Sequence, residues 1–172
     1  MKLLRHGPKG QWRPGVLDAQ GQVRDLSSVM PDITPQVLSP AGLAKLRSLD
    51  LSVLPVVQPA ELGVPWSGMG KFVCIGLNYA DHAEESNLPI PKEPIIFMKP
   101  LSAAVGPNHP VVLPQGSVKS DWEVELGVVI GTTARYVSED QALEHVAGYC
   151  VVNDVSEREY QMDRGGTWDK GK

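Results

Sequence analysis

The chain has 172 residues, with 16 basic and 20 acidic side chains and a net charge of −4. It has no basic run, so it lacks the electrostatic footprint of a protein that binds nucleic acid or an anionic membrane surface. The 42% share of apolar residues excludes wholesale disorder, and the length suits one domain of ordinary size with a small appendage. The 17 glycines and 15 prolines favour short strands and turns over long helices.

The cysteines and the N-terminal segment indicate the compartment. Cys74 and Cys150 each lie in an apolar run, where cysteine packs as a small hydrophobe, and two are too few for a disulfide framework or a thiolate zinc site. Residues 1–5 become charged again after two leucines, unlike a signal peptide, and no apolar stretch has the roughly 18 residues of a membrane span. We therefore expect a soluble, cytoplasmic protein without membrane association.

The first part of the chain predicts a small α/β domain. Residues 1–30 contain short alternating pieces separated by Gly and Pro, which favour small hairpins. Ser39 is a good N-cap and Pro40 suits the first helical position. Three leucines follow on one helix face: Leu43, Leu46 and Leu49.

A connector rich in Pro and Gly follows at residues 55–70. We place a domain boundary there, with a small N-terminal domain and linker at residues 1–68 and a second domain at residues 69–172. The second domain is predicted to have strands at residues 72–75, 94–98, 111–113, 122–130 and 148–152. Helices are predicted at residues 80–86, 139–146 (capped by Ser138) and 156–164. The predicted fold class is α+β, mostly β.

The first group of candidate functional residues is Asp121, Glu123 and Glu125. Alternate residues of a strand share a face, so the three carboxylates lie roughly 6–7 Å apart and repel one another once partly buried. Carboxylates that are buried together need a cation nearby. This can be a Lys or Arg side chain, or a hard divalent ion such as Mg²⁺, Mn²⁺ or Ca²⁺. The alternative is a solvated strand edge whose charges face water.

The second group follows an apolar strand that ends near Asp154. If a helix starts there, Asp154, Arg158 and Gln161 fall at positions i, i+4 and i+7 on one face. An acid, a guanidinium and an amide in one line suit an anionic, oxygen-rich ligand beside a metal ion. The alternative is an N-cap aspartate with a surface salt bridge.

The third group lies where a strand turns through Gly76 into a predicted helix. His82 and Glu85 are three residues apart and can share a helix face. A carboxylate that holds an imidazole makes it a better oriented and more basic proton acceptor. The alternative is an exposed histidine paired with a glutamate.

Taken together and in this order, these segments resemble the fumarylacetoacetate hydrolase family. The matching segments are residues 76–82 (GLNYADH), 94–100 (PIIFMKP), 123–131 (EVELGVVIG) and 153–161 (NDVSEREYQ). The resemblance covers about residues 70–172 and implies a mostly-β roll, which the small N-terminal domain precedes. Because the family domain continues through further strands, we expect this chain to be the N-terminal part of a longer protein.

The resemblance also implies roles for individual residues. The implied ligands of one Mg²⁺ or Mn²⁺, with Ca²⁺ as another possible occupant, are Glu123, Glu125 and Asp154. The implied catalytic residues are His82 and Glu85, which would activate water or move a proton, and Lys172, which closes the segment Trp168–Lys172. The implied substrate-binding residues are Arg158, Gln161 and Lys99. Asp121 has no ligand role by this resemblance.

The implied chemistry is that of a 2-oxo or 2,4-dioxo acid that chelates the ion and passes through an enolate stabilised by the ion and Lys172. Hydrolysis of a C–C bond is the favoured reaction. The same site would also suit a ureidoglycolate lyase, or an isomerase or decarboxylase of a 2-hydroxy-diene-dioate. A non-enzymatic alternative is a catalytically silent metal-binding domain. The family resemblance further predicts a homodimer.

Overall fold

The computed structural model describes all residues 1–172 and contains more strand than helix. The chain forms two compact units. The first unit consists of Met1–Met69, Ala104–Pro110 and Leu126–Val151, and the second of Gly70–Ala103, Val111–Glu125 and Val152–Lys172. The segments Ala104–Pro110 and Leu126–Val151 therefore belong with the N-terminal unit although they come from the second part of the sequence. None of the helices has the length and apolar character that crossing a membrane requires.

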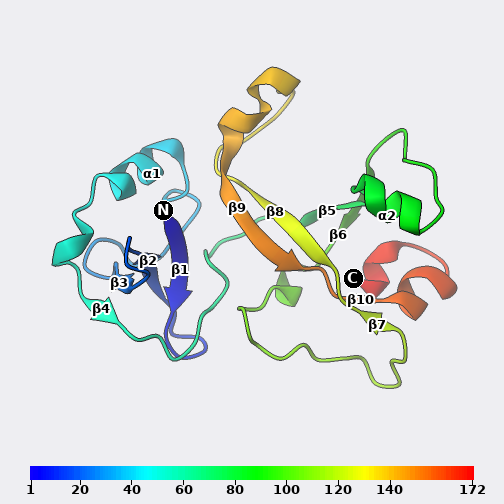
Figure 1. The fold of residues 1–172 in the computed structure, drawn as a ribbon, viewed down its shortest axis with the longest axis horizontal. Helices are drawn as coiled ribbons and strands as arrows, with labels where there is room; N and C mark the ends of the chain where they lie inside the picture. Colours follow the sequence, from blue (N-terminus) through cyan, green and yellow to red (C-terminus); the bar gives the residue numbers. More distant parts are fainter. The chain divides into compact units, whose positions relative to one another are not determined.

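The first unit contains an antiparallel sheet with the strand order β1-β2-β3-β4 (Figure 1). Its strands are β1 (Lys2–His6), β2 (Arg13–Leu17), β3 (Val23–Asp25) and β4 (Val56–Val57). The turns between the first three strands are short, so the hairpins predicted from the alternating pattern are confirmed.

Helix α1 (Pro40–Arg47) supplies the other side of the core of this unit. As predicted, Ser39 is its N-cap, and its hydroxyl accepts a hydrogen bond from the Gly42 amide at 3.2 Å. A short 3-10 turn, Leu51–Val53, follows the helix. The buried core consists of Val16, Leu26, Ile33, Leu38, Leu43, Leu46 and Leu54. Leu49 lies beyond the end of the helix and packs at the edge of this core.

The second unit carries two short antiparallel pairs. Strands β5 (Val73–Gly76) and β6 (Ile95–Met98) pair, and helix α2 (Ala80–Glu85) lies between them in the chain. Strands β7 (Ser120–Asp121) and β10 (Ser156–Glu157) also pair. Three short helical segments complete this unit: the 3-10 turns Leu101–Ala103 and Trp168–Gly171 and the π-helix Glu159–Asp163.

Strands β8 (Val124–Ile130) and β9 (Val146–Asn153) form a two-stranded ribbon (Figure 1). Along β8, exposed residues alternate with half-buried ones, as a strand with one covered face requires. Val129 packs against the core of the first unit. Val128 and Ile130 remain about half exposed, because the ribbon is covered on one face only.

Two predicted elements of the second domain have a different form. Residues 111–113 form no strand, because they have no partner strand and the prolines at positions 110 and 114 cannot donate ladder hydrogen bonds. The segment Glu139–His145 is a 3-10 helix rather than an α-helix. The hydroxyl of Ser138 donates to the side chain of Gln141 and does not cap the backbone.

The predicted helix over residues 156–164 is also wrong in its first part. Ser156 and Glu157 pair with Asp121 and Ser120 as β10 and β7. The π-helix Glu159–Asp163 begins only after this pair. Strand pairing with residues some 35 positions earlier in the chain therefore overrides the local helical pattern.

Candidate active site

A buried lysine lies between two carboxylates in the second unit. The ammonium of Lys172 donates to Glu123 Oε2 at 2.7 Å and to Asp154 Oδ2 at 3.1 Å. The Lys172 side chain is only 3% exposed, and its ammonium lies 4.9 Å from the centre of the Phe97 ring. Asp154 directly follows β9, the strand end where the sequence predicted a functional carboxylate.

Lys99 contacts the second carboxylate oxygen of Asp154, Oδ1. Its ammonium donates to the Val155 carbonyl at 3.0 Å and lies 2.5 Å from Asp154 Oδ1, and both side chains are 7% exposed. Oδ1 therefore forms a close, buried ion pair with Lys99, although the contact lacks hydrogen-bond geometry. Lys99 was expected to bind substrate, but in this structure its contact is with Asp154.

Arg158 binds the Glu123 carboxylate oxygen that Lys172 does not contact, Oε1. Its guanidinium donates to Glu123 Oε1 at 2.6 Å, to Asp121 Oδ2 at 2.8 and 3.1 Å, and to Gln161 Oε1 at 3.0 Å. Four of the five guanidinium N–H groups are therefore used within the protein. Arg158 and Gln161 were expected to hold a substrate carboxylate, and here they hold each other. Asp121, which the sequence left without a role, is the main partner of the Arg158 fork.

Glu123 lies just before β8 and Glu125 lies within it, so the strand predicted over residues 122–130 begins only at Val124. Both are partly buried, whereas Trp122, Val124 and Leu126 are 74%, 69% and 59% exposed. Burial opposes ionisation of Glu123, but hydrogen bonds from Lys172 and Arg158 outweigh it and lower the pKa of Glu123. The predicted alternative of a fully solvated edge therefore does not hold for this carboxylate.

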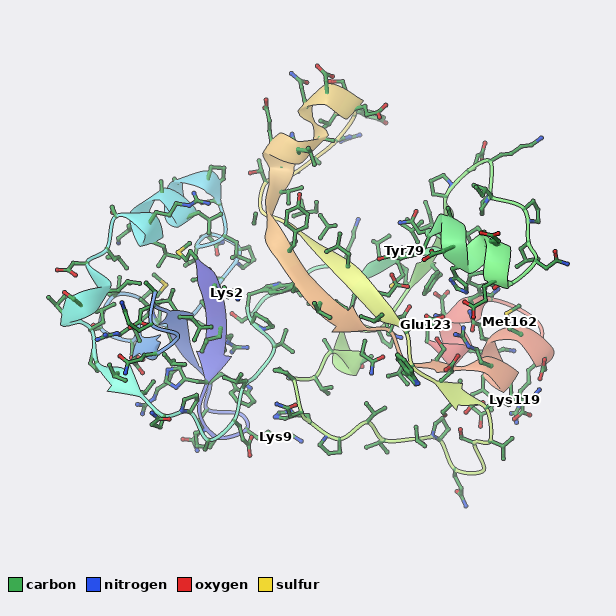
Figure 2. The ribbon with its side chains drawn as sticks, viewed as in Figure 1. Lys2, Lys9, Tyr79, Lys119, Glu123 and Met162 are labelled. Carbon is green, nitrogen blue, oxygen red and sulfur yellow. The ribbon has the colours of Figure 1, made fainter.

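Glu125 has no cationic partner. Burial raises the pKa of Glu125, the nearby carboxylates of Glu123 and Asp154 add to this rise, and a hydrogen bond from the Tyr79 hydroxyl opposes it. Tyr79 immediately precedes α2 and thereby links the start of that helix to Glu125; Figure 2 labels Tyr79 and Glu123. Sequence reasoning missed Tyr79, because no local pattern shows that its hydroxyl reaches a strand more than 40 residues away.

His82 and Glu85 both lie on α2 and are exposed. Their side chains form neither a hydrogen bond nor an ion pair with each other in this structure. The His82 backbone amide instead donates to Asp81 Oδ1 at 2.9 Å. The two residues share a short helix as predicted, and their action as a catalytic dyad stays a prediction.

The nearby thiol of Cys74 is chemically quiet. Burial, together with the negative charge of Asp154, raises the pKa of Cys74 to about 11. A thiol with this pKa is protonated at neutral pH.

The position of Lys172 depends on the turn that precedes it. Trp168 packs on Phe97 with ring centres 5.7 Å apart, and the Asp169 carboxylate accepts the Met98 amide at 2.7 Å. At Gly171, an added Cβ would lie 2.5 Å from the Gln161 nitrogen and 2.6 Å from the Glu157 carbonyl oxygen. Only glycine allows this close approach of the two backbones.

We therefore predict that Gly171→Ala displaces Lys172 and destabilises the protein by about 1–3 kcal/mol, the usual cost of overpacking. Gly70→Ala is the matched control, because an added Cβ there meets no atom within 4 Å. Urea unfolding of the two variants tests this. Equal midpoints for both variants would show that the turn yields without cost.

The donor set suits a hard divalent ion. Glu123, Glu125 and Asp154 are oxygen donors, and Glu125 forms no ion pair, although the charge of Lys172 acts on it. In this structure the three carboxylates are not gathered into a ready three-ligand cluster, because ammonium and guanidinium groups hold two of them. The chemistry of the residues fits a metal ion, and its binding stays a prediction.

Comparisons with known proteins identify relatives of the whole chain. The model of the fumarylacetoacetate (FAA) hydrolase C-terminal domain matches residues 71–172. A protein of Burkholderia lata, named only as a hydrolase, is 60% identical over 173 residues, and the match covers 100% of this chain and 61% of that protein. This chain thus spans about three fifths of the length of such relatives.

Three solved structures have the same fold. The fumarylacetoacetate hydrolase of Exiguobacterium antarcticum is 30% identical with a TM-score of 0.78, and the match covers 100% of this chain and 62% of that one. Maleylpyruvate hydrolase from Sphingobium sp. SYK-6, in complex with manganese(II) and pyruvate, is 25% identical (TM-score 0.75, 99% and 62% covered). A 5-carboxymethyl-2-hydroxymuconate delta-isomerase from Mycobacterium smegmatis is 28% identical (TM-score 0.67, 100% and 61% covered).

The matched family domain covers more than half of the chain and contains every residue of the site described above. The strand, helix and turn that carry these residues occur in an enzyme fold shared by hydrolases and isomerases. The chain belongs to the fumarylacetoacetate hydrolase family.

Proposed function

We propose that the protein is a divalent-metal-dependent enzyme that hydrolyses a C–C bond of a 2,4-dioxo acid. The observation that supports this most strongly is the buried Lys172 ammonium between Glu123 and Asp154, next to a third carboxylate, Glu125, that has no cation. A cation-binding set of oxygens and a buried ammonium at one place suit a reaction in which negative charge develops on the substrate.

Glu123, Glu125 and Asp154 would hold one Mg²⁺ or Mn²⁺. When bound, the ion would act as a Lewis acid toward the carboxylate and 2-oxo oxygens of the substrate. The related maleylpyruvate hydrolase was solved with manganese(II) and pyruvate. Pyruvate is also the fragment that hydrolysis of a 2,4-dioxo acid would release, which supports the same substrate class here.

The protein residues would divide the remaining work. His82, with Glu85 on the same helix to orient it when substrate is bound, would take a proton from a water molecule, whose oxygen adds to the C4 carbonyl carbon. The C3–C4 bond then breaks, and its electron pair passes to the three-carbon fragment. The Lys172 ammonium faces the negative charge on the 2-oxygen of this fragment. The proton returns to C3, so that one water and one 2,4-dioxo acid give pyruvate and a carboxylic acid.

Arg158 and Lys99 would act mainly through the carboxylates. Arg158 keeps a single N–H for the substrate, so it would contribute one hydrogen bond rather than a bidentate clamp. The ion pair of Arg158 with Glu123 orients that carboxylate, and the ion pair of Lys99 with Asp154 orients the other. Both residues thus preorganise the oxygens that would face the ion.

Pyruvate release tests this proposal. We expect short acylpyruvates to release pyruvate in the presence of Mg²⁺ or Mn²⁺, as measured by coupling to lactate dehydrogenase and NADH, and EDTA to stop the release. His82→Gln should lower the rate by about 10²–10⁴-fold, the contribution of general base catalysis. Metal-independent release, or a His82→Gln rate equal to that of the unmodified protein, would contradict the mechanism.

Isomerisation of a 2-hydroxy-diene-dioate is the second candidate, because related solved structures include isomerases. It would use the same proton-moving residue but release no pyruvate. The appearance of a new ultraviolet absorbance from the diene-dioate, without NADH consumption in the coupled assay, would favour this reaction over hydrolysis.

A further inference from the structure

The second unit has a groove that the catalytic residues do not account for. It has a volume of about 320 Å³ and is lined by residues 75–80 on one side and 90–94 on the other. Tyr79 lies in its wall, and the hydroxyl of the same residue donates to Glu125. The groove is therefore connected through one side chain to the proposed metal ligands.

The backbone of the groove wall is held in an unusual conformation. Leu77 has a φ of +50°, in the left-handed region that a leucine rarely adopts. At Gly76, an added Cβ would lie 2.4 Å from the Trp168 ring, so a side chain has no room there. Strained turns of this kind persist where the surrounding structure imposes them, and they are frequent at ligand sites. This turn sets the position of Tyr79.

The walls of the groove offer apolar surface. Ile75, Tyr79 and Ile90 line it and are 37%, 40% and 69% exposed, so each has surface that a bound ligand could cover. Leu77, Ala80 and two prolines, at positions 91 and 94, complete the apolar part of the lining, and Asn78, Lys92 and Glu93 supply its polar part. Burial of such surface favours a hydrocarbon group.

The charges around the groove disfavour an anion. The segment 80–94 carries four acids, Asp81, Glu84, Glu85 and Glu93, against one lysine, Lys92, and the neutral His82. Lys92 and Glu93 both line the groove, so the lining itself carries no net charge. The other three acids leave the segment net negative, which opposes the approach of a second carboxylate.

We propose that this groove receives the uncharged, apolar arm of the substrate, so that the enzyme selects monocarboxylic acylpyruvates over dicarboxylic substrates. The inference rests on the proposed function, because the 2-oxo acid end of the substrate must lie at the carboxylate site. It assigns selectivity to Ile75, Tyr79 and Ile90.

Two ligands with six carbons test the selectivity: 2-oxohexanoate ends in a methyl group and 2-oxoadipate in a carboxylate. Titrated calorimetrically in Mg²⁺, 2-oxohexanoate should bind at least tenfold more tightly than pyruvate, since each buried CH₂ contributes about fourfold in affinity. It should also bind at least tenfold more tightly than 2-oxoadipate. Equal or tighter binding of 2-oxoadipate would overturn the proposal.

Two variants test whether the apolar arm of the substrate lies in the groove. Ile90→Asp should lower the affinity for 2-oxohexanoate about tenfold and leave that for oxalate, which has no arm, unchanged. Leu88→Asp adds the same charge to the same segment outside the groove lining and should change neither affinity. An equal loss in both variants, or an equal loss for oxalate, would overturn the placement.

Oxalate binding distinguishes a failure of the proposed function from a failure of the groove assignment. If oxalate shows no metal-dependent binding, the proposed function fails and the groove assignment falls with it. If oxalate binds with the metal but 2-oxohexanoate binds no better than pyruvate, the proposed function stands and only the groove assignment is overturned.

Discussion

Lys172→Met should reduce pyruvate release by roughly 10²–10³-fold, the usual effect of removing one group that stabilises developing negative charge. It should also destabilise the protein by about 3 kcal/mol, because it removes a buried partner of two carboxylates. Glu123 would lose its contact at 2.7 Å and Asp154 its contact at 3.1 Å. The charge of these two buried carboxylates would then be compensated less completely. Initial rates and urea unfolding at pH 7 measure the two effects.

Lys170→Met is the matched control for this variant. Lys170 lies two residues away, is exposed, and its ammonium contacts only the Arg164 carbonyl, at 3.1 Å. We expect no more than a small change in rate or stability. If Lys170→Met were as inactive as Lys172→Met, the loss would come from the turn Trp168–Gly171 and not from the Lys172 ammonium.

Glu123→Gln and Glu125→Gln should change stability in opposite directions at pH 7. Glu123 has ion pairs with Arg158 at 2.6 Å and with Lys172 at 2.7 Å, so its neutralisation should cost about 2 kcal/mol. Glu125 has no cation and faces two like charges, so its neutralisation should stabilise the protein. Both variants should nevertheless lose metal binding, because each removes one proposed ligand.

The pH dependence of the same two variants provides a second test. The pKa of Glu123 is below its ordinary value of 4.5, so the stabilisation by the ionised group is present above pH 4.5 and is lost as the pH falls through the folded-state pKa. The pKa of Glu125 is above 4.5, so its ionisation weakens the fold as the pH rises from 4.5 through the folded-state pKa. The contrast between the variants should be greatest near neutrality and shrink in acid. Equal unfolding midpoints for both variants at pH 7 would contradict this electrostatic description.

Local patterns predicted the parts of the fold that local forces decide. Ser39 caps a helix because its hydroxyl satisfies a free amide of the first turn, and this needs no distant partner. The partial burial of Glu123 and Glu125 between exposed neighbours was predicted correctly, although Glu123 lies just before β8. The position of Asp154 directly after β9 was also predictable, because the apolar run of that strand ends just before it.

Contacts between distant segments account for what the sequence did not reveal. Residues 156–157 pair with residues 120–121, and this pairing replaces the helix that the local pattern favoured. Arg158 binds Asp121 because the same pairing brings them together, and most of the guanidinium N–H groups thereby contact carboxylates of the protein. Asp121 did carry a signal, since it shares the alternation of Glu123 and Glu125.

Calorimetric titration of oxalate, a planar mimic of the 2-oxo acid end, tests most directly whether these carboxylates form a metal-dependent site for 2-oxo acids. The titration is done with Mg²⁺ and with EDTA, on the unmodified protein and on Glu125→Gln, which should remain folded. We predict binding with Mg²⁺ only, and its loss in Glu125→Gln. Oxalate binding that persists in EDTA, or that is unchanged in Glu125→Gln, would contradict a metal site built from Glu123, Glu125 and Asp154.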